Sequence, residues 1–286
     1  MKLSELIPPV LYELLLKLAE RVKLISVKNK EDLRKNILLK NIGKGKRAFM
    51  IATGPSIKQE DLSVLAGEDC FSISNFFLHD QLAAVNPSFH FFAPYHEPLV
   101  LDNYISWLRQ ADATLPQKTQ MVLCLRDKKM IEENQLFANR AIHYLQFSNS
   151  PYFSDKVDLE FPILSPITGP LMMLPVLIYM GYSQIYLIGC DHTVLRDYKR
   201  EIKHFYDNEK DMRLNASNID SWHGIIESHQ YSLATFLQYN YYKKMINKTY
   251  KGVDVINLSQ DTWLDLFAMD TLNEVIKYKG LAEESK

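Results

Sequence analysis

Residues 166–192, PITGPLMMLPVLIYMGYSQIYLIGCDH, constrain the fold more than any other part of the chain. They predict an apolar helix, a turn at Gly181, and a fully apolar strand over 184–188. The strand ends close to Asp191 and His192. Ligands of open parallel sheets bind at the carboxyl ends of the strands, so this pair marks a place to look for chemistry.

Similar apolar runs of strand length recur along the chain, at 48–53, 70–74, 89–93, 121–125, 142–147 and 253–258. Helical patterns separate several of them, at 57–66, 100–110 and 231–247. Buried strands that alternate with helices are typical of a parallel sheet covered on both faces. We therefore expect an α/β protein with a mostly parallel sheet and helices on both faces, Rossmann-like and nucleotide-binding.

Composition narrows the class of protein. The net charge of the 286 residues is only −1, which disfavours a nucleic-acid binder. The three cysteines show no paired spacing and lie in or beside apolar runs, as expected of reduced core residues in a cytoplasmic protein. No run reaches the roughly 18–20 apolar residues that a membrane span needs.

The first 46 residues form a basic arm, which divides the chain into 1–46 and a catalytic domain over 47–286. Its leucines and valines recur at helical spacing beside lysines and an arginine. Residues 1–30 therefore suit a helix that lies on the inner membrane face, attracted by anionic lipid. Packing against its own domain or against a second copy of the chain is the alternative.

The regular pattern fails between Asp191 and Gln230. Residues 195–222 are polar, charged and aromatic, without clear periodicity. A segment of this length in a compact domain is often a lid. We predict a lid subdomain over 192–230, with a surface insertion as the alternative.

Polar residues and glycines follow several predicted strands. Thr53, Gly54, Pro55 and Ser56 form a strand–turn–helix junction, where backbone N–H groups can approach a phosphate, although a plain tight turn fits equally.

Three further ligand contacts are predicted. Asn75 ends the second strand, where it can bind a ligand or simply form a turn. Thr168-Gly169 starts the apolar helix, and the threonine can cap it or bind a ligand. Asp191 can hold a ribose or orient the lid.

Four of the eight histidines, at positions 192, 204, 223 and 229, fall in or around the predicted lid. His223 and His229 are six residues apart, which is not a usual metal-ligand spacing, and the chain has no Asp-x-Asp. A single histidine can act as a general base without metal. We therefore predict no metal and no cofactor.

These motifs resemble those of the bacterial sialyltransferases of glycosyltransferase family 42, within the wider group of MptE-like proteins. The resemblance covers roughly residues 47–260 and is carried by GPSIK, SNFF, TGP and MGYSQIYLIGCD. It implies a single-domain GT-A-like variant of the nucleotide-binding fold. It further implies a CMP-linked sugar donor, a glycan or glycolipid acceptor, a lid and a histidine base.

The resemblance also implies roles for individual residues. The 53–56 turn, Asn75, Thr168-Gly169 and Asp191 would bind the donor. Tyr198 would stabilise the departing phosphate. His229 would be the base, with His223 as the alternative.

Three positions depart from the family pattern. Thr53 and Ala93 stand where asparagines are expected, and Thr193 stands where a phosphate-contacting tyrosine is expected. These departures leave two other functions open, an Mg²⁺-dependent pyrophosphokinase of the MptE type and a non-catalytic binding protein of a polysaccharide pathway.

Overall fold

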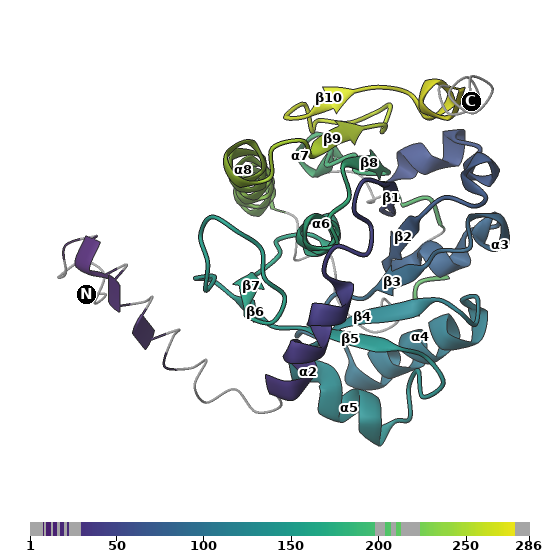
Figure 1. Cartoon of the computed structure of the whole chain (residues 1–286). Helices are drawn as coiled ribbons and strands as arrows, with labels where there is room; N and C mark the ends of the chain where they lie inside the picture. The colour runs from purple at the N-terminus through teal and green to yellow at the C-terminus, as the bar shows by residue number, and fades with distance from the viewer. Residues whose placement is uncertain are drawn as a thin grey trace.

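The computed structural model describes residues 30–197, 204–206, 210–212 and 224–277, with Pro8 and parts of 10–22 in the arm. Its main sheet has eight described strands in the order β10-β9-β8-β1-β2-β3-β4-β5 (Figure 1). Every pairing in this sheet is parallel. The predicted α/β fold with a mostly parallel sheet is confirmed.

The strands of this sheet are β1 (Arg47–Ile51), β2 (Cys70–Ile73), β3 (Phe89–Phe91), β4 (Gln120–Cys124), β5 (Ile142–Leu145), β8 (Gln184–Ile188), β9 (Asp254–Asn257) and β10 (Ala268–Met269). A small separate sheet pairs β6 (Phe147–Ser148) with β7 (Ile163–Leu164). The α-helices are α2 (Lys30–Arg34), α3 (Leu82–Val85), α4 (Leu101–Thr114), α5 (Lys128–Glu133), α6 (Gly169–Tyr179), α7 (Val194–Asp197) and α8 (Ile225–Thr249).

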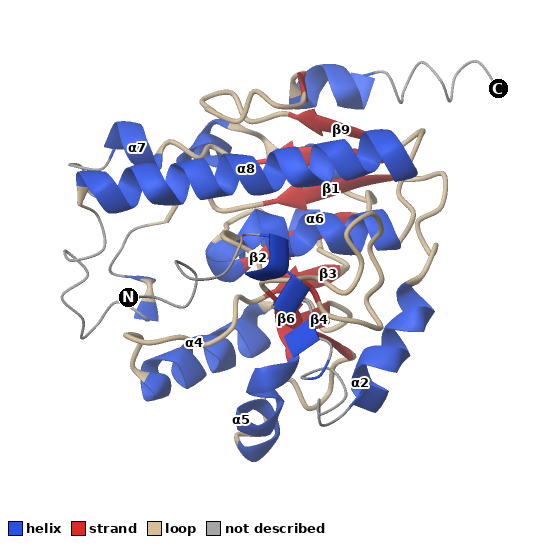
Figure 2. Ribbon diagram, turned by 90° about the vertical axis from the view of Figure 1, so that its left-hand side faces the viewer, coloured by secondary structure: helices blue, strands red, loops and turns tan. Residues whose placement is uncertain are grey.

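Two hydrophobic cores lie on opposite faces of the sheet, because alternate side chains of each strand point to opposite sides. In β1, Ala48 and Met50 join the core under α6 and α8, whereas Phe49 and Ile51 join the core under α4. Figure 2 shows α6 and α8 together on one face. Burial on both faces explains why the strands are apolar throughout rather than alternating.

The helix and glycine turn predicted from 166–192 are confirmed. From Pro170 to Tyr179, every residue of α6 is buried. Gly181 follows with φ = +81°, a left-handed conformation that glycine adopts without steric cost. The turn leads directly into β8, the strand that pairs with both β1 and β9.

The helix expected over 57–66 is wrong in type. Two 3₁₀ helices, η3 (Pro55–Gln59) and η4 (Leu62–Leu65), replace it. Glu60 between them is extended, and the Asp61 carboxylate accepts the Ser63 N–H at 3.0 Å to start the second helix. A side chain that caps a new turn competes with a continuous α-helix.

Residues 30–46 of the predicted arm pack onto the sheet. The Asn36 side-chain amide donates to the carbonyls of Tyr144 and Leu159, at 2.7 and 2.9 Å. Leu33 and Leu39 are buried in the two cores. Among the described helices, none combines the length and apolar character required to cross a membrane.

Candidate nucleotide-binding cleft

A cleft of about 630 Å³ opens at the carboxyl ends of β1, β2, β3 and β8. The chain runs from β1 outward to β5 on one side and continues with β8 on the other, so β1 and β8 flank the point where the strand order reverses. Ligands of doubly wound sheets bind at this point. The volume is within the range of small-molecule sites. The lining consists of 52–55, Ile73, Ser74, Ala93, 168–170, Gly189, 191–194, Arg196, Asp197, His204, Tyr206, Tyr231 and Asp261.

The first turn reaches this cleft, with Thr53, Gly54 and Pro55 in its lining, and its predicted contact with a donor phosphate stays a prediction. Ser56 lies beneath them, buried, and attaches the turn to Asp191. Its N–H donates to Asp191 Oδ2 at 2.9 Å, and its hydroxyl donates to Oδ1 at 2.5 Å. Both ends of the Asp191 carboxylate are therefore used to hold the turn.

Burial raises the pKa of Asp191, and the two hydrogen bonds from Ser56 oppose that rise. Asp191 is only 4% exposed, yet it belongs to the lining of the cleft. Through these hydrogen bonds, Asp191 connects the turn that follows β1 to the segment that follows β8. A direct contact between Asp191 and a donor remains a prediction.

Asn75 lies outside the cleft lining, and Ser74 takes its place there. Ser74 has φ = 58°, and Asn75 is fully buried with its Oδ1 accepting the indole N–H of Trp107 from α4. Its Nδ2 has no partner among the described residues. The left-handed turn at Ser74 thus accompanies an Asn75 side chain that faces α4, and its predicted contact with a donor is untested.

His90 fixes that turn, a role that the sequence did not suggest. Its Nε2 lies 3.0 Å from the Ser74 carbonyl, which can only accept, so Nε2 carries the proton. Nδ1 then accepts the Ser72 hydroxyl at 2.7 Å. Burial lowers the pKa of His90 to about 3, so the ring is neutral and structural.

Thr168 and Gly169 line the cleft at the N-terminus of α6, and their contact with a donor stays a prediction. The N-terminus of this 11-residue helix places the positive end of its dipole at the cleft, although Pro170 has no N–H and the Leu171 N–H donates to the Thr168 carbonyl at 3.0 Å. Gly169 packs tightly on β2, because a Cβ there would lie 2.7 Å from Ile73 Cδ1. This end of the cleft therefore suits an anionic group.

His192 is the histidine that the structure brings to the end of β8. Its Nε2 lies 2.9 Å from the hydroxyl of Tyr239, a fully buried residue of α8. Burial lowers the pKa of His192 to about 4. The ring is therefore neutral near pH 7, and no described residue is hydrogen-bonded to Nδ1. The sequence indicated this position because His192 closely follows the end of the predicted strand 184–188.

His229 occupies a different environment. It is exposed on the first turns of α8, with Nδ1 2.8 Å from the Ile225 carbonyl, and does not belong to the described lining. His223 and Tyr198, the other two predicted catalytic residues, lie outside the described residues. The catalytic roles of all three remain predictions.

The two departures at Ala93 and Thr193 both line the cleft. From the predicted lid, His204 and Tyr206 join the lining, while Phe205 packs 5.1 Å from the ring of His79. Residues 204–206 of the predicted lid thus lie against the cleft and against the body of the domain. Its function as a lid remains a prediction.

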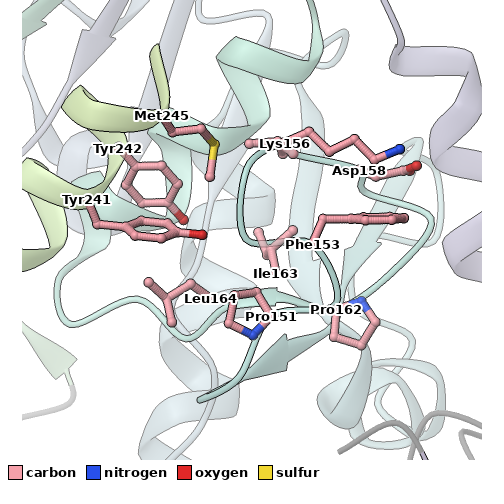
Figure 3. Close-up of a pocket in the computed structure, with 11 residues that line it drawn as sticks. Pro151, Phe153, Lys156, Asp158, Pro162, Ile163, Leu164, Tyr241, Tyr242 and Met245 are labelled. Carbon is pink, nitrogen blue, oxygen red and sulfur yellow. The ribbon is translucent and has the colours of Figure 1, made fainter. Parts of the chain in front are cut away.

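A second cavity lies between the 151–164 segment and α8 (Figure 3). Tyr241, Tyr242 and Met245 line it from α8. Its volume of about 10 Å³ has room for about one water molecule. This cavity is too small for a substrate.

No family model and no curated protein matches the chain. Among solved structures, it is similar to the sialyltransferase CstII from Campylobacter jejuni in complex with cytidine-5'-monophosphate, at 17% identity and a TM-score of 0.46, covering 80% of this chain and 86% of that one. It is also similar to an alpha-2,3-sialyltransferase from Campylobacter jejuni in apo form, at 15% identity and a TM-score of 0.42, covering 84% and 95%.

Proposed function

We propose that this protein is a glycosyltransferase that moves a sugar from a CMP-activated donor, a sialic acid or related acidic sugar, to a cell-surface glycan or glycolipid. The cleft at the reversal of strand order carries the proposal. Its lining gathers the 53–55 turn, Thr168, Gly169 and Asp191, which the motif resemblance assigns to the donor.

In this mechanism, the acceptor hydroxyl oxygen attacks the anomeric carbon of the donor sugar. The bond from that carbon to the CMP phosphate oxygen breaks, and the phosphate leaves with the bonding electron pair. The positive end of the α6 dipole would stabilise the resulting negative charge. A histidine would take the hydroxyl proton.

Two histidines compete for the role of base. The motif resemblance favours His229, whereas the geometry favours His192, because His192 belongs to the described lining of the cleft and His229 does not. A Tyr239-bonded Nε2 that carries the proton would leave Nδ1 as the basic nitrogen.

Thermal stability in the presence of nucleotides tests the proposal. A ligand at about 100 times its Kd stabilises the folded state by about 2.7 kcal/mol. We expect CMP or CDP to raise the Tm by several degrees without added metal, and UDP, GDP and ATP to leave it unchanged. A rise only with ATP and Mg²⁺ would favour the pyrophosphokinase instead. Binding of CMP without hydrolysis or transfer of a CMP-sugar would favour the non-catalytic alternative.

The pyrophosphokinase needs Mg²⁺ as well as ATP, and carboxylates are suitable ligands. Asp191, Asp197 and Asp261 line the cleft. However, Asp191 is bonded through both oxygens to Ser56, and Asp197 and Asp261 are both paired with Arg196. Within the described ranges, no three acidic, histidine or cysteine side chains are placed to hold one ion.

We propose that residues 1–30 attach the enzyme to an anionic membrane surface. Among the described residues of this segment, the large apolar side chains are exposed, with Leu14 52% and Leu18 56% accessible. Such a face, flanked by basic residues, binds lipid through apolar burial and charge attraction. Membrane attachment would bring the cleft to a lipid-linked acceptor.

Vesicle sedimentation tests this attachment. We expect the protein to sediment with phosphatidylcholine–phosphatidylserine vesicles, less so at high salt. The double variant Leu14→Asp/Leu18→Asp should stay in the supernatant. Leu237→Asp, on an equally exposed leucine of α8, is the control and should still sediment. If the wild-type protein does not bind vesicles and forms dimers in solution, the arm instead packs on a second copy of the chain.

A further inference from the structure

Arg196 on α7 is the one lysine or arginine among the described residues that line the cleft. A CMP-linked donor brings a phosphate, and an acidic sugar adds a carboxylate. The planar guanidinium of arginine can donate two parallel hydrogen bonds to a phosphate or to a carboxylate. Arginine is therefore a common side chain for phosphate recognition. The position of Arg196 therefore bears directly on donor binding.

Two carboxylates hold the guanidinium at the wall of the cleft. Nη1 lies 2.7 and 2.9 Å from the two oxygens of Asp261, and Nε and Nη2 lie 3.0 and 2.9 Å from those of Asp197. All three nitrogens of Arg196 are engaged in this arrangement. A phosphate that binds the guanidinium bidentately would have to replace one of the carboxylates.

Asp261 is the partner that can be replaced at low cost. Its side chain is 57% exposed, compared with 20% for Asp197. Exposed ion pairs contribute only about 0–1 kcal/mol, and a released Asp261 carboxylate would return to water. Asp197 is the adjacent residue in the chain and would stay beside the guanidinium.

The sequence around Arg196 supports the same role. Thr193 stands where the resembling family has a phosphate-contacting tyrosine, and both Thr193 and Arg196 line the cleft. The two residues lie three positions apart, since Thr193 directly precedes α7 and Arg196 lies within it. A guanidinium here would supply the charge stabilisation that the threonine cannot.

We propose that Arg196 binds the phosphate of the nucleotide donor by exchanging Asp261 for it, so that Asp261 holds the guanidinium in place until the donor arrives. This inference rests on the proposed function, since it requires a nucleotide in the cleft. The guanidinium then remains with the phosphate as negative charge develops on the leaving group.

Calorimetric titration with CMP and with cytidine isolates the phosphate contact, because the two ligands differ only in that group. For the wild type we expect CMP to bind more tightly than cytidine. Arg196→Gln should lower this CMP preference by about tenfold or more and leave the Kd of cytidine unchanged. Lys58→Gln, which removes an exposed cation outside the described lining, is the control and should leave both Kd values unchanged.

Asp261→Asn provides an independent test with a gain of binding. It should raise CMP affinity severalfold, because Arg196 no longer has to give up a charged partner. In the double variant with Arg196→Gln this gain should disappear, as expected of two residues that act through one contact. A gain that persists in the double variant would mean that Asp261 merely repels the phosphate.

The remaining outcomes distinguish the two proposals. An unchanged CMP preference in Arg196→Gln overturns the role of Arg196 and leaves the proposed function intact. An equal loss of CMP and cytidine binding in that variant assigns Arg196 to the shape of the cleft wall, which also contradicts the inference. A wild type that binds neither ligand overturns the proposed function and the inference with it.

Discussion

Replacing His192 with glutamine is expected to lower the kcat of glycosyl transfer by about 10²–10⁴-fold, the usual contribution of a general base. Glutamine can keep a hydrogen bond to the Tyr239 hydroxyl but cannot accept the acceptor proton. CMP binding should change little. Single-turnover transfer assays and calorimetric titration with CMP separate the two effects.

The pH dependence gives a second readout for the same residue. Because burial lowers the pKa of His192 to about 4, the neutral ring that can accept a proton is present at all pH values above this. The acidic limb of kcat/KM, which reports the free enzyme, should therefore fall near pH 4.

The pKa of His192 also links pH to stability. Its pKa lies below the ordinary value of 6.5, so its contribution to folding is complete above about pH 6.5 and is lost as the pH falls towards 4. His192→Gln should remove this part of the acid sensitivity, which urea unfolding between pH 4 and 7 would measure.

His229→Gln is the matched comparison, since His192 and His229 stand near the two ends of the predicted lid segment. If His192 is the base, this variant should retain most of its transfer activity. The reverse result, with transfer lost in His229→Gln and kept in His192→Gln, would favour the prediction from the motif resemblance. It would also require α8 to bring an exposed side chain into the cleft when the donor binds.

Replacing Gly54 with alanine is expected to destabilise the protein and abolish CMP binding. The added Cβ would lie 2.4 Å from the carbonyl oxygen of Gly189 and 2.6 Å from Asp191 Cγ. The φ of Gly54 is −62°, which alanine tolerates, so the effect is purely steric. Neither obstacle is a flexible chain end, and the turn must therefore move.

Movement of the turn would also break the Ser56–Asp191 hydrogen bonds. Overpacking costs about 1–3 kcal/mol, and a buried carboxylate that loses its donors costs about as much again. Urea unfolding should show the loss of stability, and titration should show the loss of CMP binding.

Gly67→Ala is the control for this variant. Gly67 has no atom near the added Cβ, although its φ of +81° brings a modest backbone cost. It should lose some stability and retain CMP binding. A Gly54→Ala protein with wild-type stability and wild-type CMP affinity would show that the turn is not held as the structure indicates.

The main strands could be predicted because burial on both faces leaves a local signature. A run such as Ala48–Ile51 is apolar regardless of which strand lies beside it. The 57–66 segment was mispredicted because Asp61 caps a new turn, and capping depends on single hydrogen bonds that a hydrophobic pattern does not record. The short strand β10 was not predicted, because both its residues are exposed and leave no apolar run in the sequence.

The candidate site could be predicted only in part. The 53–55 turn and Thr168-Gly169 lie in the cleft because carboxyl strand ends and a helix N-terminus must gather at one edge of a parallel sheet. Asn75 does not line the cleft, since the left-handed Ser74 precedes it and its side chain faces Trp107. The left-handed backbone at Ser74 thus accompanies a change of direction that the sequence pattern did not predict.

The pattern of residues alone predicted the fold class, the strands of the main sheet around 166–192, and the carboxyl edge of that sheet as the place to expect ligands. Those features depend on residue-by-residue burial, which local composition records. The folded chain was needed to show that Asp191 holds Ser56 across 135 positions of the chain, and that Arg196 contacts Asp261 across 65. Such contacts depend on how distant segments approach one another, and the linear pattern carries no signal for that approach.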